Sequence, residues 1–210
     1  IQPGDRVALE ATTAAIPLIE ALYGEILQAG GHPLPLLSLD KEEEIIFEHG
    51  NAEQLAFINP YRQLAYENFE SRMRIHSMVN TRAMTNVDSE KQAERQKSGS
   101  SILATQMRRG AAKEFKWLTT LFPTNAYAME ASMSLMEFED FVYKACLADG
   151  SIEDPIAAWN QIKVNQQHFI DHIQGFDQVE LRGPNVDLSL SVKGRTFNNS
   201  HGKHNMPDGE

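Results

Sequence analysis

The sequence predicts an α/β fold, a layered domain with a largely parallel sheet that is flanked by helices and ends in an antiparallel hairpin. Three observations support this prediction. Strand-like and helix-like segments alternate over roughly the first 175 residues, which is typical of a layered α/β domain. The first strand–helix–strand unit takes about thirty residues, the length of a right-handed crossover between parallel strands. After Gly175 the hydrophobic period changes to two, which indicates paired strands.

The first elements form this crossover and the helix after it. Arg6–Glu10 is predicted as a strand, and a helix follows from a cap at Thr12 or Thr13, with apolar residues at helical spacing. Leu34–Leu39 is predicted as a buried strand, and the prolines around its start place that start at a sheet edge or lead-in. Asp40 is predicted to cap the second helix, because three glutamates then occupy its positive first turn.

The middle of the chain continues the alternation. Ala52–Phe69 is predicted to be helical with an interruption before Pro60. Arg72–Val79 alternates between apolar and charged residues, which favours a half-exposed strand over a central parallel one. Asp88–Ala112 is predicted as one long polar helix, and Lys116–Leu121 as the next strand.

The last elements are two helices and the hairpin. Ser134 and Glu137 form a capping box, and Asp154 precedes a proline at the first position of another helix. Gln178–Arg182 and Asp187–Val192 are predicted as the two strands of the hairpin. The helix after the capping box is predicted to bury Leu135, Phe138, Phe141 and Ala145.

Composition argues against several classes of partner. The formal net charge is −10 without a basic stripe, and an acidic chain repels nucleic-acid phosphates and anionic lipid. No apolar run approaches the ~20 residues of a membrane span. Cys146 is the one cysteine, and we interpret it as a small buried residue rather than a nucleophile. A single cysteine fits a reducing compartment, so we expect a cytoplasmic protein without nucleic-acid or membrane partners.

Two histidines raise the question of a zinc site. His168 and His172 are four residues apart on one helical face, as in zinc proteases, but Phe169 stands where that motif has its glutamate. Both histidines are expected to face solvent, away from the predicted buried stripe. That stripe consists of Ile162, Gln166, Phe169 and Ile173. A nucleotide site is not predicted either, because neither glycine-rich phosphate motif occurs.

The C-terminal run Asn198–Glu210 collects residue types that bind divalent metals. It contains His201, His204, Asp208 and Glu210. Its spacing alone favours a polar loop with a Pro-Asp-Gly turn over a metal site.

Val192–Thr196 and Asn205–Glu210 resemble the most characteristic stretch of the metallo-aminopeptidases typified by aminopeptidase T and aminopeptidase S. Other segments match the family in the same order, so the resemblance covers nearly the whole chain. They are Pro3–Val7, Ala29–Pro33, Asn80–Ala83, Phe122–Thr124, Met133–Ser134 with Glu137 and Glu139–Phe141, Gly183–Pro184 and Asp187–Leu188.

The resemblance implies an N-terminal α/β domain over residues 1–176, while residues 177–210 begin a C-terminal domain that lies mostly outside the sequence. It further implies a homodimer that removes N-terminal residues from peptides with two divalent metal ions, Zn²⁺ or Co²⁺. Glu210 corresponds to one metal ligand, whereas His201 and His204 do not correspond to ligands. No catalytic residue is assigned in these 210 residues, and we expect the piece alone to be inactive. The alternative is a non-catalytic α/β module for binding or dimerisation.

Overall fold

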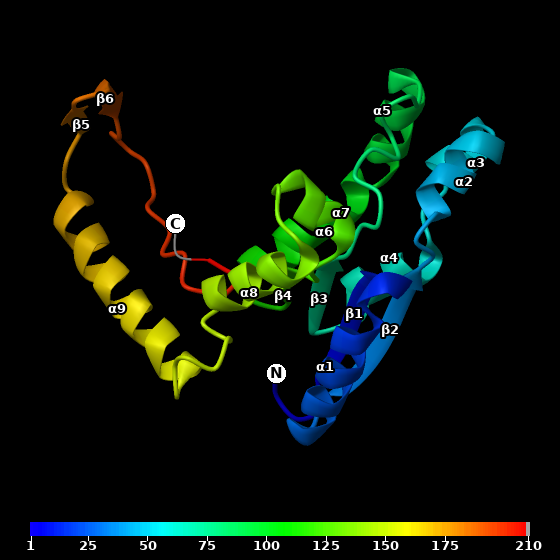
Figure 1. Cartoon of the computed structure of the whole chain (residues 1–210), viewed down its shortest axis with the longest axis horizontal. Coiled ribbons are helices and arrows are strands. Elements are labelled where there is room, and N and C mark those ends of the chain that lie inside the picture. Colours follow the sequence, from blue (N-terminus) through cyan, green and yellow to red (C-terminus); the bar gives the residue numbers. More distant parts are fainter. Residues whose placement is uncertain (209–210) are drawn as a thin grey trace. The chain divides into compact units, whose positions relative to one another are not determined.

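The computed structural model of the chain describes residues 1–208, which form two compact units (Figure 1). The first unit contains Ile1–Val142 and His204–Met206, and the second contains Tyr143–Lys203 with Pro207 and Asp208. Each unit is compact through its own contacts. The two compact units part after Val142. This division does not test the predicted domain boundary after residue 176, which stays a prediction.

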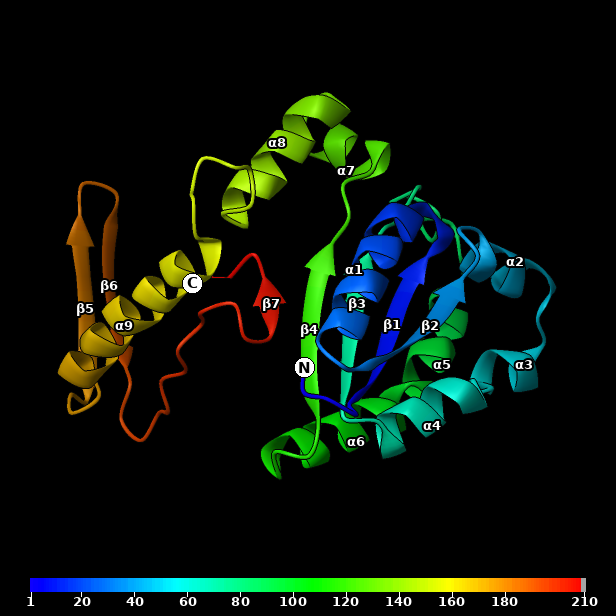
Figure 2. The same cartoon turned by 90° about the horizontal axis from the view of Figure 1, so that it is seen from below.

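A parallel sheet of five strands forms the centre of the first unit, in the order β2-β1-β3-β4-β7 (Figure 2). This confirms the predicted α/β fold with a largely parallel sheet. β2 is an edge strand, which agrees with the prolines at its start, but the predicted burial of this strand is wrong, because Leu34, Leu37 and Leu39 are exposed. The strands are β1 (Arg6–Thr12), β2 (His32–Ser38), β3 (Ser71–His76), β4 (Lys116–Leu121) and β7 (Asn205–Met206).

Helices cover both faces of the sheet, and β1 is therefore buried on both sides. Val7 and Leu9 pack with α1 on one face, while Ala8 packs with α4 and α6 on the other. The helices are a 3₁₀ turn (Thr13–Ala15), α1 (Ile16–Gln28), α2 (Glu42–His49), α3 (Ala52–Ala56), α4 (Pro60–Asn68), α5 (Ser89–Ser98), α6 (Ser100–Ala111), α7 (Asn125–Glu130), α8 (Leu135–Ala145) and α9 (Pro155–Ile173). Within residues 1–208, no helix has the length and apolar character needed to cross a membrane.

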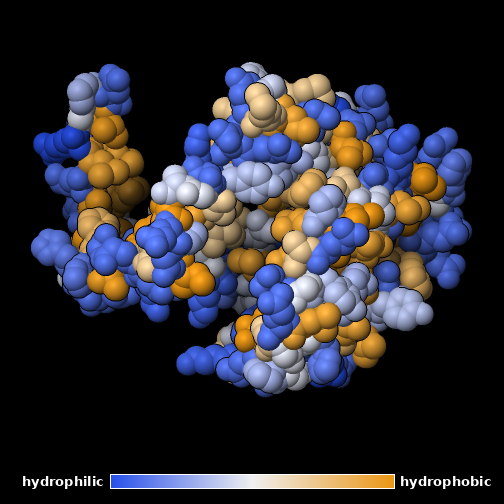
Figure 3. Space-filling model, turned by 60° about the horizontal axis from the view of Figure 1, so that its bottom comes forward, coloured by the Kyte–Doolittle hydropathy of each residue, from blue (hydrophilic) through white to orange (hydrophobic). Residues whose placement is uncertain are grey.

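The second unit contains α9 and an antiparallel hairpin of β5 (Gln178–Gly183) and β6 (Val186–Ser191), which confirms the predicted hairpin. The hairpin exposes apolar side chains, visible as orange atoms in Figure 3. His168 and His172 are exposed, as expected.

Two phenylalanines were wrongly assigned to buried stripes. Phe169 is 63% exposed and Phe141 is 56% exposed. In α8, Phe138 is buried as predicted, and the other buried residue is Val142, four residues later and therefore on the same helical face.

Two local predictions about helices were also wrong. Asp40 does not cap α2, because the N-cap residue of this helix is Lys41. The Oδ1 atom of Asp40 instead accepts a hydrogen bond from the amide of Ala14 at 3.1 Å. The predicted long helix is broken at Gly99 into α5 and α6, although Asp88 caps its start as expected.

The most informative correction concerns β3, which is a central parallel strand between β1 and β4 rather than a half-exposed one. Its charged side chains are accommodated because they find polar partners inside the protein. Arg72 is only 4% exposed, and its Nη2 atom donates to Oε1 of Gln106 on α6 at 3.1 Å.

Candidate functional site

The C-terminal run is fixed to the edge of the sheet through β7. Asn205 and Met206 pair with Thr119 and Thr120 of β4 in parallel. The amide of Thr119 donates to the carbonyl of His204 at 2.8 Å, and the hydroxyl of Thr120 donates to the carbonyl of Met206 at 2.7 Å. Because the pairing is parallel, the chain leaves Met206 toward the carboxyl edge of the sheet.

The two histidines of this run have partners within the protein. The ring of His204 stacks on Trp117 at a centroid distance of 4.2 Å and an interplanar angle of 16°. Nδ1 of His201 lies 2.9 Å from the carbonyl oxygen of Asn199. Asp208 also has a structural contact, because its Oδ2 atom accepts a hydrogen bond from the amide of Gly202 at 2.8 Å. That bond closes the loop just before its last residues.

Glu210, the predicted metal ligand, lies outside the described residues. Within residues 1–208, no group of three or more histidine, cysteine, aspartate or glutamate side chains is arranged to hold a metal ion. The exposed pair His168 and His172 therefore stays a pair without a third donor in that range. The described part of the chain does not form a metal centre by itself.

A polar cluster on β1, β3 and α4 was missed by the sequence analysis. The carboxylate of Glu10 accepts hydrogen bonds from Nε of Arg62 at 3.1 Å, from Nε of Arg74 at 2.9 Å and from the Tyr66 hydroxyl at 3.2 Å. Nη2 of Arg74 also donates to the hydroxyl of Tyr66 at 2.7 Å. Glu10 and Tyr66 are both buried, so this network joins two strands and a helix inside the unit.

The environment of the cluster perturbs two titrating groups. Burial raises the pKa of the Tyr66 hydroxyl, and the nearby charge of Glu10 raises it further. Burial lowers the pKa of His76, and the charges of Arg74 and Arg72 lower it further. One signal for this cluster was present in the sequence: Glu10 is an acid that directly follows the apolar run Val7–Leu9 of a strand, and a buried acid needs a partner.

The cluster borders a cavity of about 420 Å³ at the carboxyl edge of the sheet. The ends of β1, β2 and β3 and the start of α4 contribute its walls. The lining residues are Glu10–Thr12, Pro35–Ser38, Asn59, Tyr61, Arg62 and Arg74–Met78.

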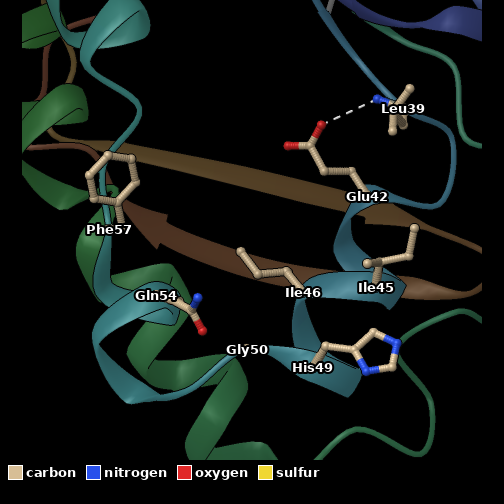
Figure 4. A pocket seen from close by; sticks show the side chains of 8 residues that line it. All are labelled: Leu39, Glu42, Ile45, Ile46, His49, Gly50, Gln54 and Phe57. Carbon is tan, nitrogen blue, oxygen red and sulfur yellow. Dashed lines mark hydrogen bonds between the residues drawn. The ribbon is translucent and has the colours of Figure 1, made fainter.

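A second cavity, between α2 and α3, has mostly apolar walls (Figure 4). Ile46 and Phe57 border it, and its acid, Glu42, accepts a hydrogen bond from the amide of Leu39 at 3.2 Å. This acid is engaged by the backbone, and His49 is the other titratable residue in the lining.

Comparisons with known proteins identify a family and a structure that the chain resembles. Residues 1–210 match the model of a family described as thermophilic metalloprotease (M29). No curated protein matches the chain. A solved structure of wild-type AmpT from Thermus thermophilus is similar in fold, with a TM-score of 0.72 at 15% sequence identity. The likeness covers 99% of this chain and 56% of that one, so the chain spans about half the length of AmpT. Because the family model matches every residue of the sequence, the chain belongs to the thermophilic metalloprotease (M29) family.

Proposed function

We propose that the whole protein is a metal-dependent aminopeptidase that releases N-terminal amino acids from peptides. The observation that carries this proposal is the family match over residues 1–210, which includes the segment Asn205–Glu210. Residues 1–176 then form the N-terminal α/β domain, and residues 177–210 begin a second domain. We further propose a cytoplasmic homodimer acting on peptides.

Glu210 is proposed as one ligand of a site for two divalent ions, Zn²⁺ or Co²⁺. Two kinds of observation support this assignment. A carboxylate is a suitable ligand for such ions. The backbone before Glu210 is also held in place, by the bond of Thr120 to Met206 and the bond of Gly202 to Asp208. Since residues 1–208 contain no set of three donors, the other ligands are proposed to come from the second domain of the whole protein.

The experiment compares one peptide with a free N-terminus and the same peptide with an acetylated N-terminus. The whole protein should release the first residue of the free peptide only, and EDTA should abolish the release until Zn²⁺ or Co²⁺ is added. Glu210→Gln should lose bound metal and at least about a hundredfold in activity, because the ions polarise the substrate and activate water. Glu180→Gln, on the exposed strand β5, is the control and should behave as wild type.

Three results would contradict the proposal. Equal cleavage of the acetylated peptide would exclude an aminopeptidase, and a Glu210→Gln variant with full metal content and activity would exclude that ligand. No cleavage of either peptide with metal present would favour the non-catalytic binding or dimerisation module. The lack of a three-donor cluster within residues 1–208 is the observation on the side of that alternative.

A further inference from the structure

The cavity beside Glu10 lies where the strand order of the sheet reverses. From β1 the chain moves to β2 on one side, and from β2 it crosses to β3 on the other side of β1 (Figure 2). In open α/β sheets, ligands bind in the crevice outside the carboxyl ends of the strands at such a reversal. The topology alone therefore marks this cavity of about 420 Å³ as a place for a ligand.

Positively charged side chains outnumber negatively charged ones around the cavity. Glu10 is the one acid among its lining residues, which include Arg62 and Arg74. Arg72 adds a third positive charge that acts on both arginines and on Glu10, although its own hydrogen bonds go to Gln106, Thr119 and the carbonyl of Leu118. A partly buried cation without a matching anion costs free energy. An anion entering the cavity would reduce that cost.

The two lining arginines keep donors for such an anion, since within residues 1–208 no hydrogen bond is described for either Nη atom of Arg62 or for Nη1 of Arg74, whereas Nη2 of Arg74 donates to Tyr66. Each binds Glu10 through its Nε atom, while the side chains of Arg62 and Arg74 are still 41% and 31% exposed. The planar fork of a guanidinium group matches the geometry of a carboxylate or a phosphate. A phosphate dianion fits less well, because Glu10 lies against both arginines and would repel the second charge.

Part of the cavity lining is apolar. The β2 residues Pro35, Leu36 and Leu37 form this part. A ligand that combines a carboxylate with an apolar group would therefore find partners for both groups among the lining residues.

We propose that this cavity binds a small organic carboxylate, with its anionic group at Arg62 and Arg74 and its apolar group along β2. The proposal does not depend on the peptidase function. Two sources provide this chemistry, the C-terminal carboxylate of a peptide and a free organic acid.

Calorimetric titration of the whole protein tests the proposal with N-acetylleucine and its amide, which lacks the carboxylate. We expect saturable binding of the acid and at least about tenfold weaker binding of the amide, because the charge-assisted hydrogen bonds are lost. Inorganic phosphate should bind more weakly than the acid. N-acetylglycylleucine distinguishes the sources: tighter binding than N-acetylleucine indicates a peptide terminus, and equal or weaker binding indicates a free acid.

Variants connect the binding to the cavity. Arg62→Gln should weaken the binding of N-acetylleucine about tenfold, and Arg62→Lys should weaken it less because the charge is kept. Arg82→Gln, an exposed arginine paired with Glu130, is the matched control and should bind as wild type. Circular dichroism establishes that each variant is folded. Equal affinity for acid and amide, unchanged binding by Arg62→Gln, tighter binding of phosphate, or no saturation up to about 50 mM acid would overturn the proposal.

Discussion

At the scale of single residues, the ion pair of Arg6 and Glu70 joins the start of β1 to the residue before β3. Nη2 of Arg6 lies 2.7 Å from Oε1 of Glu70, and the backbone amide of Arg6 donates to Oε2 at 2.7 Å. Arg6 also donates to the carbonyl of Asn68. The hydrogen bonds from Arg6 lower the pKa of Glu70 to about 2, because they favour the ionised carboxylate.

This pair predicts a pH-dependent contribution to stability. The pKa of Glu70 is depressed in the folded protein, so its contribution is present above about pH 4.5 and is lost as the pH falls toward 2. Glu70→Gln should lower the urea midpoint at pH 7 slightly, as expected for a partly exposed pair, and the difference from wild type should shrink toward pH 2. Urea unfolding at several pH values measures it. Glu48→Gln, whose side chain is 73% exposed, is the control; an equal effect of both substitutions would contradict the assignment.

At the scale of elements, the packing of α6 on β4 depends on a glycine within the helix. A Cβ atom on Gly110 would lie 2.4 Å from Cζ3 and 3.0 Å from Cη2 of Trp117. The ring of Trp117 is also constrained, because it stacks on His204 just before β7. The indole therefore has little freedom to move away from the helix.

Gly110→Ala should destabilise the protein, although alanine favours a helix by up to about 1 kcal/mol. The clash with the Trp117 ring should exceed this gain and leave a net loss of about 1–3 kcal/mol. Gly99→Ala is the matched control, since its Cβ atom would meet nothing closer than 3.5 Å and its backbone is already helical. That variant should be neutral or slightly more stable in thermal unfolding. If both variants were equally stable, the close approach would not limit the packing.

The elements themselves were largely predictable, because hydrophobic period and capping residues are local signals. Asp88, Ser134 and Asp154 each cap or precede the helix that the sequence assigned to them. The position of β3 in the sheet was not predictable, since it depends on tertiary partners. Arg72 resembles an exposed residue until Gln106, more than thirty residues later, is seen to accept its hydrogen bond.

At the scale of the whole molecule, the family could be predicted from the sequence, whereas the arginine-lined cavity could not. The ordered segments that end in Asn205–Glu210 were enough to name the family, which the match over residues 1–210 confirms. The arginine-lined cavity could not be found from spacing, because Glu10, Arg62 and Arg74 come from three elements that meet only in the folded sheet. The ligand role of Glu210 stays a prediction.

The two units differ in how much of their surface they bury, and this difference should appear in hydrogen exchange. β1 is almost entirely buried, whereas α9 has no buried residue and every position of β6 is exposed. Amides in regions with few buried contacts open locally at low free energy, while core strands open only on global unfolding. In the 210-residue chain, we therefore expect amides of β1 and β3 to exchange slowest, and those of α9, β5 and β6 at least about a hundredfold faster. Mass spectrometry of peptic fragments measures both groups in one experiment. Equal protection of the hairpin and β1 would mean that the second unit is stabilised by more than its own contacts, and the description as two compact units would have to be revised.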